Sequence, residues 1–180
     1  MTLAWQTPGG LRVLATDFTE QTVTNSTTET SLLNGGAGYT ISSGTLVAGK
    51  ALRFTMTGNV NNNSGGNINL TVKLKLGGTT FYSGVLTTQN GQIVTPQEVT
   101  AFVNANNASN SQRAFATWAN LASNIADGSA TAASVPITGG HSALTIDMAA
   151  SQTFDATASW ASANSSATFK RWGAVLELIG

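Results

Sequence analysis

The sequence predicts a mainly β protein folded as a single antiparallel β-sandwich, and three observations support this. Thr makes up about 15% of the chain and only 9% of residues are charged, against roughly 25% in an average soluble domain; branched Thr suits the solvent face of a strand. Several segments alternate apolar and polar residues with the period of two that marks half-buried strands. Glycine-rich turns separate these segments at intervals of about 10 to 25 residues, which is typical of antiparallel strands and not of a βαβ series.

The N-terminal segment differs from the rest because its apolar residues follow no regular period. We therefore expect an arm or outer strand over residues 1–27 and the sandwich over residues 28–180. The apolar anchors of the arm are Trp5, Leu11, Val13 and Leu14. No secretory signal is expected, because no basic segment precedes an apolar one. No transmembrane segment is expected either, because the apolar runs are far shorter than the roughly 20 residues that span a bilayer.

Four segments are expected to be half-buried strands, namely 52–58, 70–76, 144–148 and 154–160. In the second of these, Leu and Val occupy one face while Thr and Lys occupy the other. The C-terminal stretch 168–179 is also extended in character. Phe169 and Trp172 have opposite parities there, so burying both rings requires a β-bulge near Gly173.

Turns are predicted where Gly, or Asn followed by Gly, can adopt the positive φ of tight turns. These turns are Asn34–Gly36, Asn61–Gly66, Gly77–Gly78, Asn90–Gly91 and Gly139–Gly140. One short helix is predicted near 96–105. Thr95 is placed to cap it, Pro96 suits its first position, and Glu98 completes a capping box. Apolar residues at helical spacing follow, and the helix is expected to end in an Asn-rich loop at 106–110.

The segment Gly44–Lys50 matches the first seven positions of a phosphate-binding loop. Such a loop requires a hydroxyl after the lysine to bind Mg²⁺, and then a helix whose N-terminus faces the phosphate. Ala51 has no hydroxyl, and an alternating strand follows it. We therefore interpret the glycines as a turn before a strand.

No catalytic, cofactor or metal site is predicted. His141, the only histidine, is expected to be solvated in the turn after Gly139–Gly140, and Ser is so abundant that its neighbour Ser142 does not indicate a triad. With one His, no Cys and no calcium-loop pattern, no zinc or calcium ligand set is recognisable. Asp147 and Asp155 lie on the outward parity of predicted strands, which favours surface solubility over a glycosidase pair.

Aromatic residues and charge bear on the partners of the chain. Trp118, Trp160 and Trp172 are candidates for a sugar-stacking platform, although the parity of Trp118 and Trp160 is more typical of a core or a subunit interface. Eight basic and eight acidic residues give a net charge of +0, which argues against nucleic acid and membrane surfaces as partners. A neutral surface also favours assembly, because net charge normally keeps domains apart.

Two stretches carry a resemblance to a known family: Thr28–Leu33, which reads TETSLL, and Tyr39–Phe54, which ends in TLVAGKALRF. The pattern continues with Gly58, the LKLGGT sequence at 74–79, and Ile146-Asp147, Asp155 and Trp160. The chain resembles a loose family of tailed-bacteriophage virion structural proteins over most of its length from Thr28 onward. It differs where Ser42-Ser43-Gly44 replaces Pro-Ala-Asn, and in residues 95–107, which have no counterpart.

The resemblance implies a β-sandwich of jelly-roll type and a non-enzymatic role on the virion surface, with no catalytic residue and no cofactor. Its members include capsid decoration or cement proteins, head fibres and tail-fibre parts, which are commonly trimeric. We therefore expect a decoration or cement protein that binds and stabilises the phage head as a homotrimer. The expected partners are further copies of the chain and the major capsid protein or another virion component, with assembly in the host cytoplasm.

The arm is the expected virion contact, through Trp5, Leu11, Val13 and Leu14, because an arm can bury apolar side chains on a neighbour. The alternative is a tail-fibre or receptor-binding module that contacts host surface glycan through Trp or Tyr side chains. Such a module is expected to show an exposed aromatic pair at one loop end.

Overall fold

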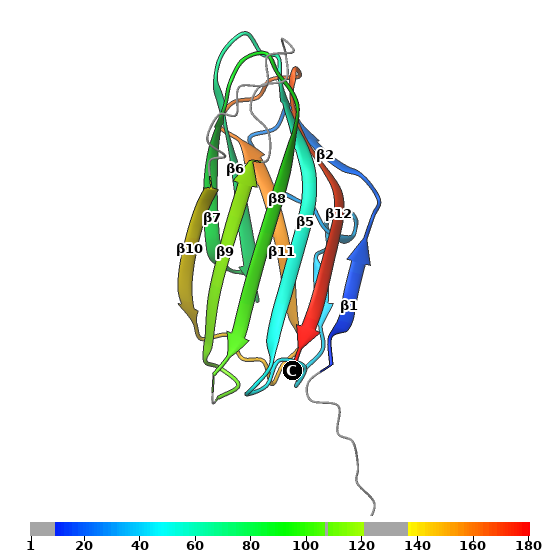
Figure 1. Cartoon of the computed structure of the whole chain (residues 1–180), viewed down its shortest axis with the longest axis vertical. Helices are drawn as coiled ribbons and strands as arrows, with labels where there is room; N and C mark the ends of the chain where they lie inside the picture. The colour runs from blue at the N-terminus through cyan, green and yellow to red at the C-terminus, as the bar shows by residue number, and fades with distance from the viewer. Residues whose placement is uncertain (1–9, 107, 121–136) are drawn as a thin grey trace, which may run out of the picture.

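The structure is a computed structural model that describes residues 10–106, 108–120 and 137–180 (Figure 1). These residues form twelve β-strands and one 3-10 turn, η1 (Asn34–Gly36). The strands are β1 (Arg12–Asp17), β2 (Gln21–Thr24), β3 (Thr30–Ser31), β4 (Tyr39–Ile41), β5 (Ala51–Asn62), β6 (Ile68–Leu76), β7 (Thr79–Thr88), β8 (Gln92–Ala105), β9 (Gln112–Asn120), β10 (Ile137–Leu144), β11 (Gln152–Trp160) and β12 (Ala167–Ile179). Within the described ranges, no helix has the length and apolar character needed to cross a membrane.

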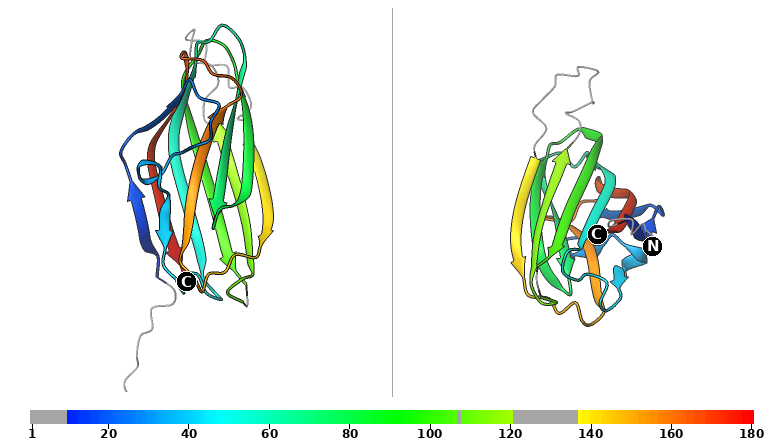
Figure 2. Two further views of the ribbon diagram at one scale, coloured as in Figure 1. Left: turned by 180° about the vertical axis from the view of Figure 1, so that it is seen from behind. Right: turned by 60° about the horizontal axis from the view of Figure 1, so that its bottom comes forward.

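The strands form two sheets that face each other (Figure 2). The large sheet has seven strands in the order β1-β12-β5-β8-β9-β10, with β2 also paired to β12. The small sheet has five strands in the order β3-β11-β6-β7, with β4 also paired to β11. Apolar side chains from both sheets meet between them; the rings of Phe54 on β5 and Phe154 on β11, for example, have centroids 4.8 Å apart. The predicted antiparallel β-sandwich is confirmed.

The pairing of the strands is nested, first with last. β1 and β2 pair with β12, β3 and β4 with β11, β5 with β8, and β6 with β7, all antiparallel. A long two-stranded ribbon rolled up in this way places alternate pairs in opposite sheets, which is the jelly-roll arrangement that the resemblance implied. β9 and β10 lie between β8 and β11 in the chain and widen the large sheet beyond β8.

The alternation read from the sequence is what positions the core. On β6, Leu70, Val72, Leu74 and Leu76 are fully buried. The predicted strands 52–58, 70–76 and 154–160 are therefore confirmed as parts of β5, β6 and β11. The segment Gly44–Lys50 is made of turns that lead directly into β5, as expected.

The predicted bulge is present in β12, although its stated reason is only half right. Arg171 is the register partner of Gly58, and Gly173 is the partner of Thr57, so Trp172 is an extra residue without a partner on β5. Phe169 is buried as expected, but the Trp172 side chain is 41% exposed. The bulge instead shifts the parity of the strand, so that Arg171 before it and Ala174 after it both point inward.

The predicted helix near 96–105 is wrong, because these residues belong to β8, which lies between β5 and β9 inside the large sheet. Its buried residues are Gln97, Val99, Ala101 and Val103, a period of two and not of 3.6. Pro96 itself is the register partner of Asn59 on β5. Backbone pairing on both sides outweighs the local capping signals at the start of the segment.

The predicted strand 144–148 and the predicted turn at Gly139–Gly140 are also wrong. Both glycines lie inside β10, paired with β9, and β10 ends at Leu144. Beyond Leu144, the Gln112 side chain takes the place of a neighbouring strand: its Oε1 accepts from the Ile146 amide at 3.1 Å, and its Nε2 donates to the Ile146 carbonyl at 2.9 Å. Residues 144–148 therefore do alternate in burial, but they form an irregular segment and not a strand.

Candidate interaction surface

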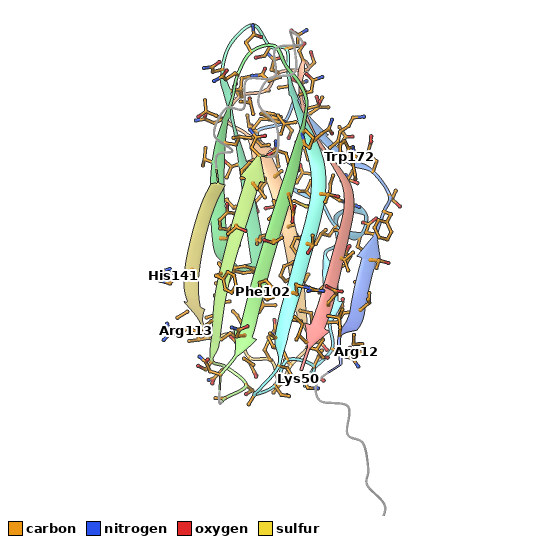
Figure 3. All side chains as sticks on the ribbon, in the orientation of Figure 1. Arg12, Lys50, Phe102, Arg113, His141 and Trp172 are labelled. Atoms are coloured by element: carbon orange, nitrogen blue, oxygen red, sulfur yellow. The ribbon has the colours of Figure 1, made fainter. Side chains whose placement is uncertain are left out.

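The outward side of the large sheet carries a row of aromatic and charged side chains across five strands. Successive register partners in this row are Glu177, Arg53, Phe102, Phe115 and His141, on β12, β5, β8, β9 and β10. The Phe102 and Phe115 rings are stacked, with centroids 5.1 Å apart and an interplanar angle of 16°. Phe115 is nevertheless 46% exposed. Figure 3 shows this side of the molecule; we call it the outer face, and its central residues are Arg53, Thr55, Thr100, Phe102, Phe115 and Thr117.

The polar groups at the centre of the outer face are largely paired with one another. Arg53 Nε lies 2.7 Å from Glu177 Oε2. In the neighbouring row, the hydroxyls of Thr100 and Thr117 lie 2.8 Å apart and share a hydrogen bond. The centre of the face therefore presents aromatic rings and threonines with little net charge.

A second pair of exposed aromatic residues lies where the β1–β2 loop passes the bulge of β12. Phe18 is 70% exposed, and Trp172, labelled in Figure 3, is 41% exposed. The Phe18 ring covers Gly173: a Cβ atom there would lie 2.9 Å from Phe18 Cδ1 and 3.7 Å from the outward Thr57 hydroxyl. The ring therefore sits on the same side of the sheet as the outer face.

The two other tryptophans proposed as a sugar platform are not available to a ligand. Trp118 and Trp160 are both buried, as their parity indicated. Trp118 Nε1 donates to Gln97 Oε1 at 2.8 Å, and Trp160 Nε1 donates to the Val23 carbonyl at 3.1 Å. Of the three predicted platform residues, only Trp172 is exposed.

The candidate arm residues fall into three groups. Trp5 lies outside the described residues. Leu11 is 55% exposed and Val13, on β1, is 54% exposed, whereas Leu14 packs against the core. Val13 is the register partner of Glu177, so it extends the aromatic row to the edge strand. Leu11 and Val13 are thus the described arm residues that can contact a partner.

A buried arginine that the sequence analysis did not single out fixes the end of β1. Arg171 is only 1% exposed. Its Nε donates to the Leu32 carbonyl at 2.9 Å, its Nη1 to the Asp17 carbonyl at 2.6 Å and its Nη2 to Asp17 Oδ2 at 2.6 Å. Its inward parity, shared with Phe169, is the signal that would have found it.

The Asp17 carboxylate receives further donors from the backbone. The Thr19 amide donates to Oδ1 at 3.0 Å and the Asn34 amide to Oδ2 at 2.9 Å. Burial raises the pKa of Asp17, but the hydrogen bonds from Arg171 and these two amides outweigh it, so the pKa lies below its ordinary value. This network holds the loop that carries Phe18 against η1.

The outer side of the small sheet is charged instead of aromatic. Glu29 forms ion pairs with Lys73, at 2.7 Å, and with Lys75. The hydrogen bonds from Lys73 and Lys75, with one from Thr157, lower the pKa of Glu29 to about 2 against the effect of burial. Burial raises the pKa of Asp155, although Ser31 Oγ donates to it at 2.6 Å. Asp155 is thus a half-buried structural group and not a freely solvated surface charge.

The remaining residues weighed for chemistry lie apart. His141 is exposed on β10 opposite Phe115, in a strand and not in a turn. Asp147 is exposed in the loop after β10, where its Oδ1 accepts from the Ala149 amide at 2.9 Å. Across the part of the chain that the structure describes, no group of three or more His, Cys, Asp or Glu residues is placed to hold a metal ion.

No protein-family model matches this chain, and no curated protein matches it. One similar solved structure is the CBM2 module of Lactobacillus casei BL23 phage J-1 evolved Dit, with 13% identity over 96% of this chain and 97% of that chain and a TM-score of 0.39. Another is infectious bursal disease virus Gt strain, with 11% identity over 97% of this chain and 42% of that chain and a TM-score of 0.21. The strand pairings, and not these low similarities, define the fold of this chain.

Proposed function

We propose that this chain is a non-enzymatic structural protein of a bacteriophage virion, and specifically a homotrimeric decoration or cement protein of the head. The observation that supports this proposal is that most of the basic side chains are paired within the chain while large apolar side chains are exposed. Five of the eight Lys and Arg residues form ion pairs within the chain, namely Arg53, Lys73, Lys75, Lys170 and Arg171, while large apolar side chains remain exposed. Exposed apolar groups on a surface with few unpaired charges are typical of a protein that buries them against other subunits.

The contact with the particle is assigned to the start of β1. Leu11 and Val13 are exposed aliphatic residues beside an edge strand of the large sheet, and edge strands present backbone groups that can pair with a partner. Leu14 packs on the core, so these side chains are held at a defined place on the sandwich. The proposed partner is the major capsid protein or another virion component.

The test is cosedimentation of the purified chain with heads that lack it, together with light scattering to measure its mass. Leu11→Asp with Val13→Asp is expected to abolish sedimentation with heads while leaving the fold and the oligomer intact. Val85→Asp is the matched control, because Val85 is 50% exposed on β7 of the small sheet, whereas the arm lies on the large sheet. Equal binding of heads by all three proteins would refute the assignment to the arm.

The Phe18 and Trp172 pair favours a second candidate, a receptor-binding module that contacts host surface glycan. Exposed aromatic rings stack on sugar rings, and Phe18 lies against Gly173, the residue next to Trp172, at the bulge of β12. This function predicts that the chain binds host polysaccharide and that Phe18→Ala with Trp172→Ala abolishes the binding. A monomer that binds polysaccharide and ignores heads would establish it in place of the decoration role.

A further inference from the structure

We infer that the outer face of the large sheet is the surface through which copies of this chain associate, so that its occupant is a second copy. The inference rests on the proposed function, because it names the surface of the homomeric contact.

The composition is that of an interface core. Aromatic residues are enriched at protein interfaces, where flat rings bury a large area at a low cost in conformational entropy. Phe102 and Phe115 stack on each other but leave Phe115 46% exposed, and in a monomer this apolar surface contacts water. A neighbouring subunit would remove it from water.

The charges of the outer face suit association with another copy of this chain. Arg53 is neutralised by Glu177 at 2.7 Å, and the other charged residues of the β8 and β9 ladder, Glu98 and Arg113, are of opposite sign. The four charges sum to zero, and the whole chain has a net charge of +0, so this face does not repel the surface of a neighbouring copy. A partner with a strong charge of either sign would gain nothing from it.

The size of the face also fits. Five strands, from β12 to β10, spaced about 4.8 Å apart, and the ladder from Gln97 to Ala105, at about 3.3 Å per residue, span roughly 24 by 30 Å, or about 700 Å². A standard interface buries about 600–1,000 Å² on each partner. The outer face is therefore large enough to hold a stable homomeric contact.

The outer side of the small sheet does not share these properties. Lys73, Lys75, Glu29 and Asp155 occupy it, and its exposed large apolar residue is Val85 on β7. Desolvating these charges would cost free energy without a compensating apolar gain. The two sides of the sandwich thus provide a test and a matched control.

The first experiment is sedimentation velocity over a range of concentrations. Phe115→Asp is expected to weaken association by at least about 30-fold, the effect of losing an interface hot spot, and Val85→Asp is expected to leave it unchanged. Circular dichroism checks that both variants fold, which is expected since both side chains point outward. Wild-type-like association of Phe115→Asp would overturn the inference.

The second experiment does not depend on a disruptive change. The chain has no cysteine, so Thr117→Cys and Val85→Cys each introduce a unique thiol, on the outer face and on the small sheet. The thiol at position 117 is expected to react at least about tenfold more slowly with iodoacetamide in the oligomer than after dilution to monomer, whereas the thiol at 85 reacts equally in both. Equal reactivity of both thiols in both states would overturn the inference.

The failure of this inference is distinguishable from failure of the proposed function. A wild-type monomer that still sediments with heads would overturn the homomeric face and leave the virion role intact. Protection of the thiol at position 117 by an added host oligosaccharide, with no change in mass, would overturn it in favour of a glycan on this face.

Discussion

The Arg171 and Asp17 pair offers the sharpest test of the structure, through Arg171→Met. The substitution keeps a long side chain in the buried site but removes three donors, two to Asp17 and one to the Leu32 carbonyl. The Asp17 carboxylate then remains nearly buried, with its side chain 11% exposed, and keeps only backbone amide donors.

The expected loss follows from the burial of the pair. Removing one partner of a buried ion pair typically costs about 3–5 kcal/mol, because the other charge is left uncompensated. A hydrogen bond that involves a charged group is worth roughly 1.5–3 kcal/mol. The loss of three such bonds therefore favours the upper end of the range for a broken buried ion pair. A domain with about 5–15 kcal/mol of total stability loses a large fraction of it.

The assay is urea unfolding, followed by circular dichroism and by the fluorescence of the buried tryptophans. Lys170→Met is the matched control, since its ion pair with Glu20 is about half exposed, with side chains 40% and 49% accessible, and exposed pairs contribute about 0–1 kcal/mol. In the Arg171→Met background, Asp17→Asn is expected to recover part of the lost stability by removing the unpaired charge. The reasoning would be refuted if Arg171→Met cost no more than Lys170→Met.

The pH dependence gives the same pair a second signature. The pKa of Asp17 is lower in the folded state than in the unfolded chain. The ionised Asp17 carboxylate therefore adds its full contribution to the free energy of unfolding above the unfolded pKa, and this contribution is lost as pH falls through the folded pKa. The stability difference between wild type and Arg171→Met is therefore expected to narrow on acidification. A difference that stays constant from neutral to acidic pH would show that the carboxylate charge is not what Arg171 compensates.

The remaining predictions concern the core, a close backbone approach and acid stability. Leu74→Lys buries an unpaired ammonium on the fully buried side of β6 and is expected to abolish soluble, folded protein, while Lys73→Leu on the opposite side leaves a native circular dichroism spectrum. Gly58→Ala drives a Cβ into the Lys170 carbonyl oxygen and is expected to lower the free energy of unfolding by about 3 kcal/mol or more, measured in urea. Gly66→Ala meets nothing within 4 Å and is expected to change it by no more than about 0.5 kcal/mol. The pKa of Glu29 is lowered to about 2 in the folded state. Its ionised carboxylate therefore contributes fully to the free energy of unfolding above the unfolded pKa, and this contribution is lost as pH falls from the unfolded pKa to about 2. Glu29→Gln should therefore flatten the acid limb of the stability curve; an unchanged acid limb would contradict this.

Local sequence was sufficient for the elements whose two faces see different surroundings. The strand over 70–76 was predictable because a strand with one buried face must alternate, and the glycine turns because positive φ disfavours other residues, as at Gly77 and Gly78. The bulge in β12 was predicted from the parity of Phe169 and Trp172, but Trp172 is exposed, and the inward residues that the extra residue separates are Arg171 and Ala174. Alternation also identified Trp118 and Trp160 as buried.

Local sequence failed where partners distant in the chain satisfy the backbone. The segment 96–105 carries a helix start, yet β5 and β9 bind it on both sides as a strand. Residues 144–148 alternate, yet the Gln112 side chain takes the hydrogen bonds that a neighbouring strand would otherwise make. In both cases a contact across the sheet outweighs a local preference of about 1 kcal/mol per residue or less.

The sequence by itself thus determined the class of fold, most of the buried residues and the low-charge surface, because these depend on the composition and parity of each strand alone. The tertiary structure decided which of these residues act together. Phe102 and Phe115 stack only through the register of β8 and β9, and Arg171 reaches Asp17 only because the rolled ribbon brings residues 154 positions apart into contact. The candidate interaction surface is of this second kind, since strand register and sheet order, and not local pattern, bring its residues onto one face.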